Sequence, residues 1–188
     1  MSDQAGNVGA AMPGKTVKVF GLAGWSGSGK TTLMRALIPA LIGCGLRVST
    51  LKHAHHAFDI DQPGKDSYEH REAGATEVLV ASAERWALMH ELRGAPEPTT
   101  ERLIGLMTPV DLVLIEGFKR EDHDKIEVHR PVLGKPLLCV HDPHIVAVAS
   151  DAALAGLSVP RLDLNDAAAI ADFVIGHCAL AGRARGVA

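Results

Sequence analysis

The chain has 188 residues, of which 19 are basic and 22 acidic, so its formal net charge is −3; this length suits one domain with a sizeable core, and the bulk charge gives no indication of a nucleic-acid partner. No apolar run approaches the roughly 20 residues of a membrane helix, and the start of the chain lacks a secretory apolar stretch, so we expect a cytoplasmic protein with no membrane partner. The three cysteines, Cys44, Cys139 and Cys178, stand far apart in apolar contexts and predict buried thiols in a reducing compartment, not a disulfide framework.

Both ends of the chain have the composition of tails. Residues 1–15 are rich in glycine, alanine and polar residues, which predicts a flexible N-terminal tail. Residues 181–188 have a similar composition and predict a flexible C-terminal tail. Between them, residues 16–180 are expected to form a single domain.

The first predicted element is a short buried strand over 17–23, and it leads into a glycine-rich loop, Gly24-Trp25-Ser26-Gly27-Ser28-Gly29-Lys30-Thr31. This loop matches the phosphate-binding pattern G-x-x-x-x-G-K-[ST], known as the P-loop. Its glycines let the backbone turn tightly and aim N–H groups at phosphate oxygens. Lys30 is expected to reach the β- and γ-phosphates, and the Thr31 hydroxyl to bind Mg²⁺.

A helix is predicted directly after the loop, with apolar residues at Leu33, Leu37 and Leu41. A strand, a glycine loop and a helix in this order are what the motif requires, and the helix N-terminus adds its positive dipole end to the anion site. We therefore expect the loop and Thr32 to bind nucleotide phosphates rather than merely connect two elements. The role of Trp25 stays open between packing on the sheet edge and contacting a partner or ligand.

The rest of the chain alternates apolar strand candidates with helical stretches. The predicted strands cover 47–52, 77–81, 86–89, 111–116, 125–129, 136–140 and 145–149. The predicted helices cover 66–73, capped by Asp66 or Ser67, then 98–106 and 166–180. This alternation predicts an α/β fold of the P-loop NTPase type, with three layers and a mostly parallel central sheet flanked by helices.

An acid stands at the carboxyl end of the apolar strand over 111–116. Ligands of open α/β sheets bind at this edge, so Glu116 is expected to hold Mg²⁺ there, directly or through water. The alternative is a solvated strand-end carboxylate. Asp111 begins the same strand about 13 Å away and is expected to be structural.

A loop with histidines and acids, from His53 to Lys65, follows the strand over 47–52 and opens on the same edge. Asp59 and Asp61 are candidates to approach Mg²⁺ or orient a water. His53, His55 and His56 match no closed zinc pattern, so substrate contact or a switch role ordered by the γ-phosphate is favoured over metal binding.

Several segments together resemble one family. Beyond the P-loop, they are Leu51-Lys52-His53-Ala54-His55-His56, Asp59-Ile60-Asp61, Pro63-Gly64-Lys65-Asp66-Ser67-Tyr68, Ala73-Gly74-Ala75, Arg85-Trp86-Ala87-Leu88-Met89, Leu114-Ile115-Glu116-Gly117-Phe118-Lys119 and Val146-Ala147-Val148-Ala149-Ser150-Asp151. Over roughly residues 17–178 the chain resembles MobB, the family of molybdopterin-guanine dinucleotide biosynthesis adaptor proteins. The linked pattern is far more specific than the P-loop alone.

The resemblance implies a homodimeric GTP-binding protein related to metallochaperone GTPases and dethiobiotin synthetase. It also implies partnership with the guanylyltransferase MobA, which attaches GMP to molybdopterin, and it raises molybdopterin or molybdoenzymes as further partners. By resemblance, Gly24 to Thr32 bind GTP and Thr31 binds Mg²⁺. Glu116 is then the Walker-B-type acid, and Asp59 is the switch-loop candidate for Mg²⁺ or water.

The Asn-Lys-x-Asp element with which many GTPases read guanine does not occur in the sequence. Asp151, just after the strand over 145–149, is a candidate to accept from guanine N1 and N2; a turn or helix cap is the alternative. Arg71, Arg93 and Arg120 are unplaced candidates for an arginine finger.

Lys30, Glu116 and Asp59 are the candidate catalytic residues, yet no catalytic glutamine is evident. GTPases that lack such groups hydrolyse GTP at only ~10⁻⁴ to 10⁻³ per second. We therefore expect at most a weak Mg²⁺-dependent GTPase. The alternatives are a nickel metallochaperone GTPase using the loop from His53 to His56, and a small-molecule kinase, for which no arginine-rich lid is visible.

Overall fold

A computed structural model describes residues 17–54, 58–117 and 121–183. The predicted tail over 1–15 lies outside these residues, as do 184–188, His55, His56 and Arg120. The chain divides into two compact units, one formed by Met1–His53 with Met107–Ala188 and the other by Ala54–Leu106. The single domain expected over 16–180 stays a prediction.

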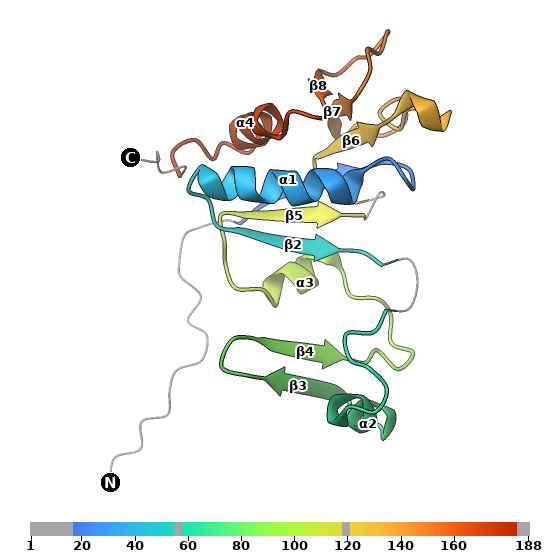
Figure 1. The fold of residues 1–188 in the computed structure, drawn as a ribbon, viewed down its shortest axis with the longest axis vertical. Coiled ribbons are helices and arrows are strands. Elements are labelled where there is room, and N and C mark those ends of the chain that lie inside the picture. Colours follow the sequence, from blue (N-terminus) through green and yellow to red (C-terminus); the bar gives the residue numbers. More distant parts are fainter. Residues whose placement is uncertain (1–16, 55–57, 118–120, 184–188) are drawn as a thin grey trace. The chain divides into compact units, whose positions relative to one another are not determined.

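The first unit is built on a six-stranded sheet in the order β2-β5-β1-β6-β7-β8, and every neighbouring pair in it is parallel (Figure 1). Its strands are β1 (Lys18–Ala23), β2 (Val48–Lys52), β5 (Leu112–Glu116), β6 (Lys125–His129), β7 (Ile145–Ser150) and β8 (Arg161–Asp163). Because all pairs are parallel, the carboxyl ends of all six strands lie at one edge. The strands β2 and β5 lie on one side of β1, and the later strands β6, β7 and β8 lie on the other. The strand order therefore reverses at β1, and ligands of α/β sheets bind at such a switch point.

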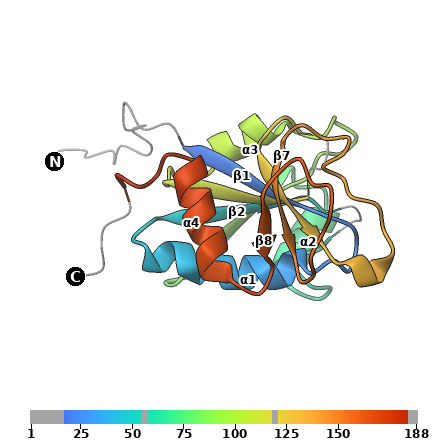
Figure 2. The same cartoon turned by 90° about the horizontal axis from the view of Figure 1, so that it is seen from above.

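Two helices pack against each other on one face of this sheet, α1 (Lys30–Gly43) and α4 (Ala167–His177) (Figure 2). On α1, the predicted apolar positions Leu33, Leu37 and Leu41 are all buried, because a spacing of four places them on one side of the helix. They join the alternate residues of the strands in one core, including Phe20, Leu22, Leu112, Leu114, Ile126 and Val128. The expected mostly parallel sheet with flanking helices is confirmed.

The other face of β6 is polar and buried. Lys125, Glu127 and His129 alternate along it with the core residues of the same strand. The Lys125 ammonium donates to the Glu121 carbonyl oxygen at 2.8 Å and to Asp142 at 3.1 Å. The stretch after β6, which contains the short 3-10 helix η1 (Pro131–Leu133), thus returns to cover this polar face.

The strand predicted over 136–140 is wrong. This segment forms no strand; instead the N–H groups of Leu138 and Cys139 donate to the Glu127 carboxylate at 2.9 to 3.0 Å. The buried Glu127 carboxylate accepts the hydrogen bonds that, in a strand, these N–H groups would donate to a neighbouring strand. The apolar run was compatible with a strand in sequence, but its amide groups have this competing acceptor.

The second unit holds α2 (Asp66–Glu72), α3 (Thr100–Gly105) and an antiparallel hairpin of β3 (Glu77–Ala81) and β4 (Trp86–His90). The predicted strands over 77–81 and 86–89 are confirmed, and they pair with each other. Thr99 caps α3 by accepting from the Arg102 N–H. The predicted cap of α2 is wrong, because Lys65 occupies the cap position without a side-chain bond and Asp66 already lies in the first turn, where its charge still favours the positive helix end.

Smaller differences concern the end of the chain and the cysteines. The short strand β8 was not predicted, and Asp166 precedes α4 as its cap, accepting from the Ala169 N–H at 2.9 Å. Cys178 is buried as expected, whereas Cys44 and Cys139 are only half-buried, so the prediction of three buried thiols is wrong for these two. All three thiols are free.

Candidate nucleotide-binding site

The phosphate loop joins β1 to α1 at the carboxyl edge of the sheet. Gly24, Gly27 and Gly29 have φ angles of 147°, 79° and 99°, in the left-handed region that favours glycine. A Cβ atom at Gly24 would lie 2.5 Å from the Val128 carbonyl oxygen, so no other residue fits there. The geometry brings a turn of backbone and the N-terminus of α1 together, an arrangement that suits an anion.

Lys30 bends back over its own loop. Its ammonium donates to the carbonyl oxygens of Gly24 at 2.9 Å and Trp25 at 3.0 Å. The charge is therefore held at the loop that the sequence assigns to phosphates. An ammonium in this place is a compact point charge of the kind that binds phosphate oxygens.

Thr31, in the first turn of α1, and Glu116, at the end of β5, form a hydrogen bond with each other. The Thr31 hydroxyl donates to Oε1 of Glu116 at 2.7 Å, and the strands that place them, β1 and β5, are direct neighbours. A hydroxyl and a carboxylate are hard oxygen ligands of the type that Mg²⁺ prefers. These two residues therefore fit a magnesium ion.

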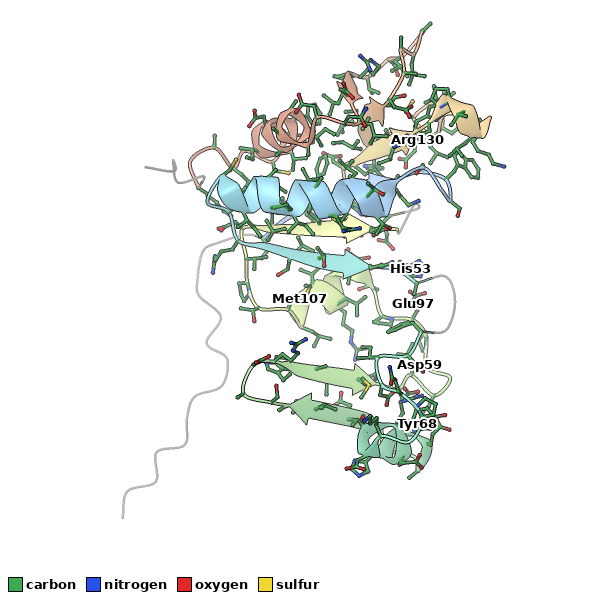
Figure 3. The ribbon with its side chains drawn as sticks, in the orientation of Figure 1. His53, Asp59, Tyr68, Glu97, Met107 and Arg130 are labelled. Carbon is green, nitrogen blue, oxygen red and sulfur yellow. The ribbon has the colours of Figure 1, made fainter. Side chains whose placement is uncertain are left out.

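Arg130, which the sequence interpretation missed, lies against the phosphate loop directly after β6 (labelled in Figure 3). Its Nε donates to the Ser28 carbonyl oxygen at 3.2 Å, and its Nη1 donates to Oδ2 of Asp151 at 2.5 Å. Asp151 follows β7, as predicted, and its carboxylate thus binds a guanidinium. The structure brings Lys30, Thr31, Glu116, Arg130 and Asp151 to one edge of one sheet.

Trp25 connects the phosphate loop to the segment after β6. The indole Nε1 donates to the Pro136 carbonyl oxygen at 2.8 Å, and the Lys135 ammonium lies 5.8 Å from the centre of the ring. The contact is thus made within the chain. The sequence also assigns Trp25 to phosphate binding, through the backbone of the loop, and this assignment stays a prediction.

Asp111 lies at the opposite edge of the sheet from Glu116, as expected. Its carboxylate accepts from the backbone N–H of Arg47 at 3.0 Å and from the Arg47 Nε at 3.4 Å. This pair links the starts of β2 and β5. Asp111 therefore has the structural role that the sequence predicted.

His53 follows β2 at the same edge as Glu116. Its N–H donates to the Glu116 carbonyl oxygen at 3.0 Å, and a Cβ atom at Gly117 would lie 2.9 Å from the His53 Cβ. Among residues 17–54, 58–117 and 121–183, no group of three or more His, Cys, Asp or Glu side chains could hold a metal ion. The histidine-based metal site therefore gains no support from this part of the chain.

Asp59 belongs to the second unit, where it lies beside Asp61 and Arg71. The Arg71 guanidinium donates to Asp59 at 3.2 Å and to Asp61 at 3.1 Å and 3.4 Å. These contacts raise the pKa of Arg71 above its usual value, chiefly through the hydrogen bond to Asp61. The magnesium and catalytic roles of Asp59 stay predictions.

Arg93, another arginine-finger candidate, also makes contacts within the second unit. It donates to the carbonyl oxygens of Arg71 at 2.9 Å and Ala75 at 3.0 Å, near the end of α2. A cation there is favoured by the negative end of a helix. These bonds give Arg93 a local structural role.

No helix in the described part of the chain has the length and apolar character needed to cross a membrane.

A family model and two relatives of high identity show the family of this chain. The family model "Molybdopterin guanine dinucleotide synthesis protein B" matches residues 19–151. A molybdopterin-guanine dinucleotide biosynthesis adapter protein of Escherichia coli (strain K12) is 48% identical over 168 residues, covering 87% of this chain and 95% of that protein. Its namesake in Haemophilus influenzae is 43% identical over 161 residues, covering 84% and 88%.

Solved structures give the same result. A crystal structure of molybdopterin-guanine biosynthesis protein B has a TM-score of 0.67 at 26% identity and covers 85% of this chain and 99% of that chain. A MobB protein homolog from Bacillus stearothermophilus has a TM-score of 0.63 at 26% identity, covering 86% and 98%. Sequence, fold and phosphate-loop geometry thus lead to one conclusion: the chain belongs to the MobB family.

Proposed function

We propose that this chain is a GTP-binding adapter in the biosynthesis of molybdopterin guanine dinucleotide, where it assists a MobA-like guanylyltransferase. The observation that carries the nucleotide part is the 2.7 Å hydrogen bond between Thr31 and Glu116 beside the phosphate loop. It joins the two residues that P-loop proteins use around magnesium. The adapter role is supported by the names of the E. coli and H. influenzae relatives.

In this proposal the loop from Gly24 to Thr32 holds the phosphates through backbone N–H groups, and Lys30 adds its charge. Thr31 and Glu116 hold Mg²⁺, which would neutralise negative charge on the β- and γ-phosphates. The choice of GTP over ATP rests on the family resemblance. The use of Asp59 as a further metal ligand is part of the proposal and has no contact in its support.

In this proposal the protein binds GTP and hydrolyses it slowly, because two of the candidate arginine fingers are engaged elsewhere. Arg71 and Arg93 are bound to acids and carbonyl oxygens of the second unit. P-loop GTPases without a transition-state arginine turn over at ~10⁻⁴ to 10⁻³ per second. Rapid turnover of GTP by the isolated protein would contradict this part of the proposal.

A homodimer completes the proposal, and the β3–β4 hairpin supplies a surface for it. Leu79 pairs with Leu88, and Ala81 pairs with Trp86, so these side chains share one face of the hairpin. Leu79 is 61% exposed and Trp86 66% exposed. An apolar face of this kind marks a site of association.

The dimer is tested by sedimentation over a range of concentrations. Leu79→Glu is expected to shift the protein towards monomer, because it places a charge in the apolar face. Leu106→Glu is the matched control, since Leu106 is also exposed but lies outside the hairpin. Equal behaviour of the two variants would contradict the hairpin interface.

The central test is calorimetric binding of GTP and of ATP with Mg²⁺ to the wild type and to Lys30→Ala. We expect tighter binding of GTP and a loss of at least about tenfold in Lys30→Ala, because a charge-assisted contact to phosphate is removed. Lys18→Ala, at the other end of β1, is the matched control. Equal affinities for GTP and ATP would remove the guanine claim, and unchanged binding by Lys30→Ala would remove the phosphate-loop claim.

The metal part has its own test. Thr31→Val and Glu116→Gln are expected to weaken GTP binding in the presence of Mg²⁺ and to leave binding in excess chelator close to that of the wild type. The reason is that Thr31→Val removes an oxygen ligand of the ion and Glu116→Gln removes the negative charge and one carboxylate oxygen, whereas both leave the loop N–H groups in place. An equal loss with and without Mg²⁺ would contradict the assignment.

The adapter role is tested with a guanylyltransferase, molybdopterin and GTP. Wild-type protein is expected to raise the yield of molybdopterin guanine dinucleotide, and Lys30→Ala is expected to raise it less. Direct contact with molybdopterin or molybdoenzymes, and location in the cytoplasm, stay predictions.

A further inference from the structure

We propose that Arg130 binds the phosphate nearest the nucleoside and that Asp151 is the positioning residue that holds its guanidinium there. The inference rests on the proposed function and deepens it. It replaces a direct role of Asp151 in reading guanine with a role exerted through Arg130.

The direction of the bound nucleotide follows from the sheet order. The Thr31–Glu116 pair marks the metal end of the site on the β5 side of β1. Residues that hold Mg²⁺ in P-loop proteins act on the β- and γ-phosphates, so the terminal phosphate would lie at this end. The nucleoside end then lies on the other side of β1, towards β6 and β7, where Arg130 and Asp151 follow their strands.

The guanidinium of Arg130 is fixed by two hydrogen bonds from different atoms, Nε to the Ser28 carbonyl oxygen and Nη1 to Asp151. A Cβ atom at Gly29 would lie 3.5 Å from Nε and 3.7 Å from Nη2, so the group lies directly against Gly29. A planar fork held in this way is prepared to bind a phosphate with little further loss of freedom.

The charge distribution also favours a phosphate. Gly29 is the cap residue of α1, and the N-terminus of a helix carries partial positive charge. Arg130 therefore lies against a positive helix end, and the Lys30 ammonium is bonded within the same loop. Asp151 compensates part of the Arg130 charge, and an anion that binds beside the guanidinium would also interact favourably with the helix end and with Lys30.

A surface ion pair of no consequence is the simplest alternative for Arg130 and Asp151, whose side chains are 33% and 26% exposed. The bond to Ser28 argues against it, because it ties the pair to the phosphate loop, 102 residues earlier in the chain. The pair thus connects the end of β7 to the backbone that holds the phosphates.

The test measures binding of GTP, ATP and inorganic triphosphate to Arg130→Gln. We expect affinities about 10- to 100-fold lower for all three ligands, because a charged hydrogen bond to phosphate does not depend on the base. Arg47→Gln is the matched control: it makes the same chemical change at the opposite edge of the sheet, where Arg47 meets Asp111. It is expected to change each affinity less than about twofold, within the range of ordinary surface changes.

Asp151→Ala and the double variant Arg130→Gln/Asp151→Ala test the positioning role. Asp151→Ala is expected to weaken all three ligands by a similar factor, and the double variant to bind no more weakly than Arg130→Gln alone, since both changes act on one contact. Arg130→Lys keeps the charge without the fork and is expected to lie between wild type and Arg130→Gln. Thermal unfolding of each variant checks that the fold persists.

The outcomes separate this inference from the proposed function. Wild-type affinities in Arg130→Gln, together with a loss in Lys30→Ala, contradict the inference and leave the proposed function standing. A loss in Asp151→Ala confined to GTP makes Asp151 a base-reading residue and contradicts its positioning role. Absence of nucleotide binding by the wild type contradicts both.

Discussion

The indole Nε1 of Trp25 donates a hydrogen bond of 2.8 Å to the carbonyl oxygen of Pro136. The two residues are 111 positions apart, and the bond ties the phosphate loop to the segment that follows β6. The same segment is bound to the sheet at Glu127. A side chain that is unusual in such a loop therefore serves to connect it with its surroundings.

Trp25→Phe is expected to lower the free energy of unfolding by about 1 kcal/mol, because it keeps an aromatic ring and removes the hydrogen bond. Urea unfolding followed by circular dichroism measures the change. Val132→Ala, at an exposed position of η1 in the same unit, is the control and is expected to have a smaller effect. An equal effect of the two substitutions would show that the Pro136 contact adds nothing to stability.

Gly21→Ala is expected to destabilise the first unit by about 1–3 kcal/mol, since the site has no room for a methyl group. A Cβ atom there would lie 2.5 Å from the His123 Nε2 and 2.9 Å from the Lys125 Cβ. Gly43→Ala is the matched control, because a Cβ at this end of α1 would meet no heavy atom within 4 Å beyond its chain neighbours and the backbone of its own helix. Thermal unfolding of both variants tests the prediction, and a Gly21→Ala protein as stable as Gly43→Ala would contradict it.

His123 is expected to make stability fall as the pH is lowered from 6.5 towards 4. Burial lowers the pKa of His123 from its ordinary 6.5 to about 4, with smaller contributions from Lys125 and His144 that the acids Asp124 and Asp142 oppose. Between these values the unfolded chain binds a proton that the folded chain does not, so acid favours unfolding.

The contribution is present above pH 6.5 and is lost as the pH falls through this window, by about 1–2 kcal/mol after allowance for partial exposure. The measurement is urea unfolding at several pH values between 7 and 4 for wild type and His123→Gln. The difference between the two proteins should change across the window. A difference that does not depend on pH would exclude His123 as the titrating group.

Glu127→Leu is expected to destabilise the protein by about 2–5 kcal/mol, because it leaves the half-buried N–H groups of Leu138 and Cys139 without their acceptor. Glu127→Gln keeps one acceptor oxygen and is expected to lose less. Hydrogen exchange of the two amides should be faster in both variants. Unchanged exchange in Glu127→Leu would mean that the carboxylate does not hold this segment.

Local patterns predicted the parts of the molecule that local forces determine. The phosphate loop was visible because its glycines, Lys30 and Thr31 are contiguous, and the strand that ends in Glu116 because its apolar run is short and unbroken. Three-residue β8 was missed because Arg161 and Asp163 are exposed and only Leu162 between them is apolar. A strand that short carries no periodicity to detect.

Contacts between residues far apart in the chain could not be predicted from local sequence patterns. Arg130 was missed because nothing in its neighbourhood distinguishes it from other arginines, and its partners Ser28 and Asp151 meet it only through the order of the strands. The segment over 136–140 was misassigned for the same reason, since the acceptor of its amides is Glu127 on another element. For Arg130, its position directly after the predicted strand over 125–129, at the end of the strand where ligands bind, is the signal that could have found it.

The position of Lys30 indicates how much the phosphate loop would have to rearrange to bind a ligand. Its ammonium is bonded to the carbonyl oxygens of Gly24 and Trp25, so it is already where a phosphate would meet it. Binding is then an exchange of partners, in which phosphate oxygens compete with carbonyl oxygens for the same three protons. The loop has little reorganisation to undergo, and affinity depends on the difference between two sets of hydrogen bonds. In the proposed nucleotide complex, a ligand with fewer negative charges would gain less from that exchange, so we expect the loop to discriminate among nucleotides by the charge of their phosphates as well as by contacts with the base.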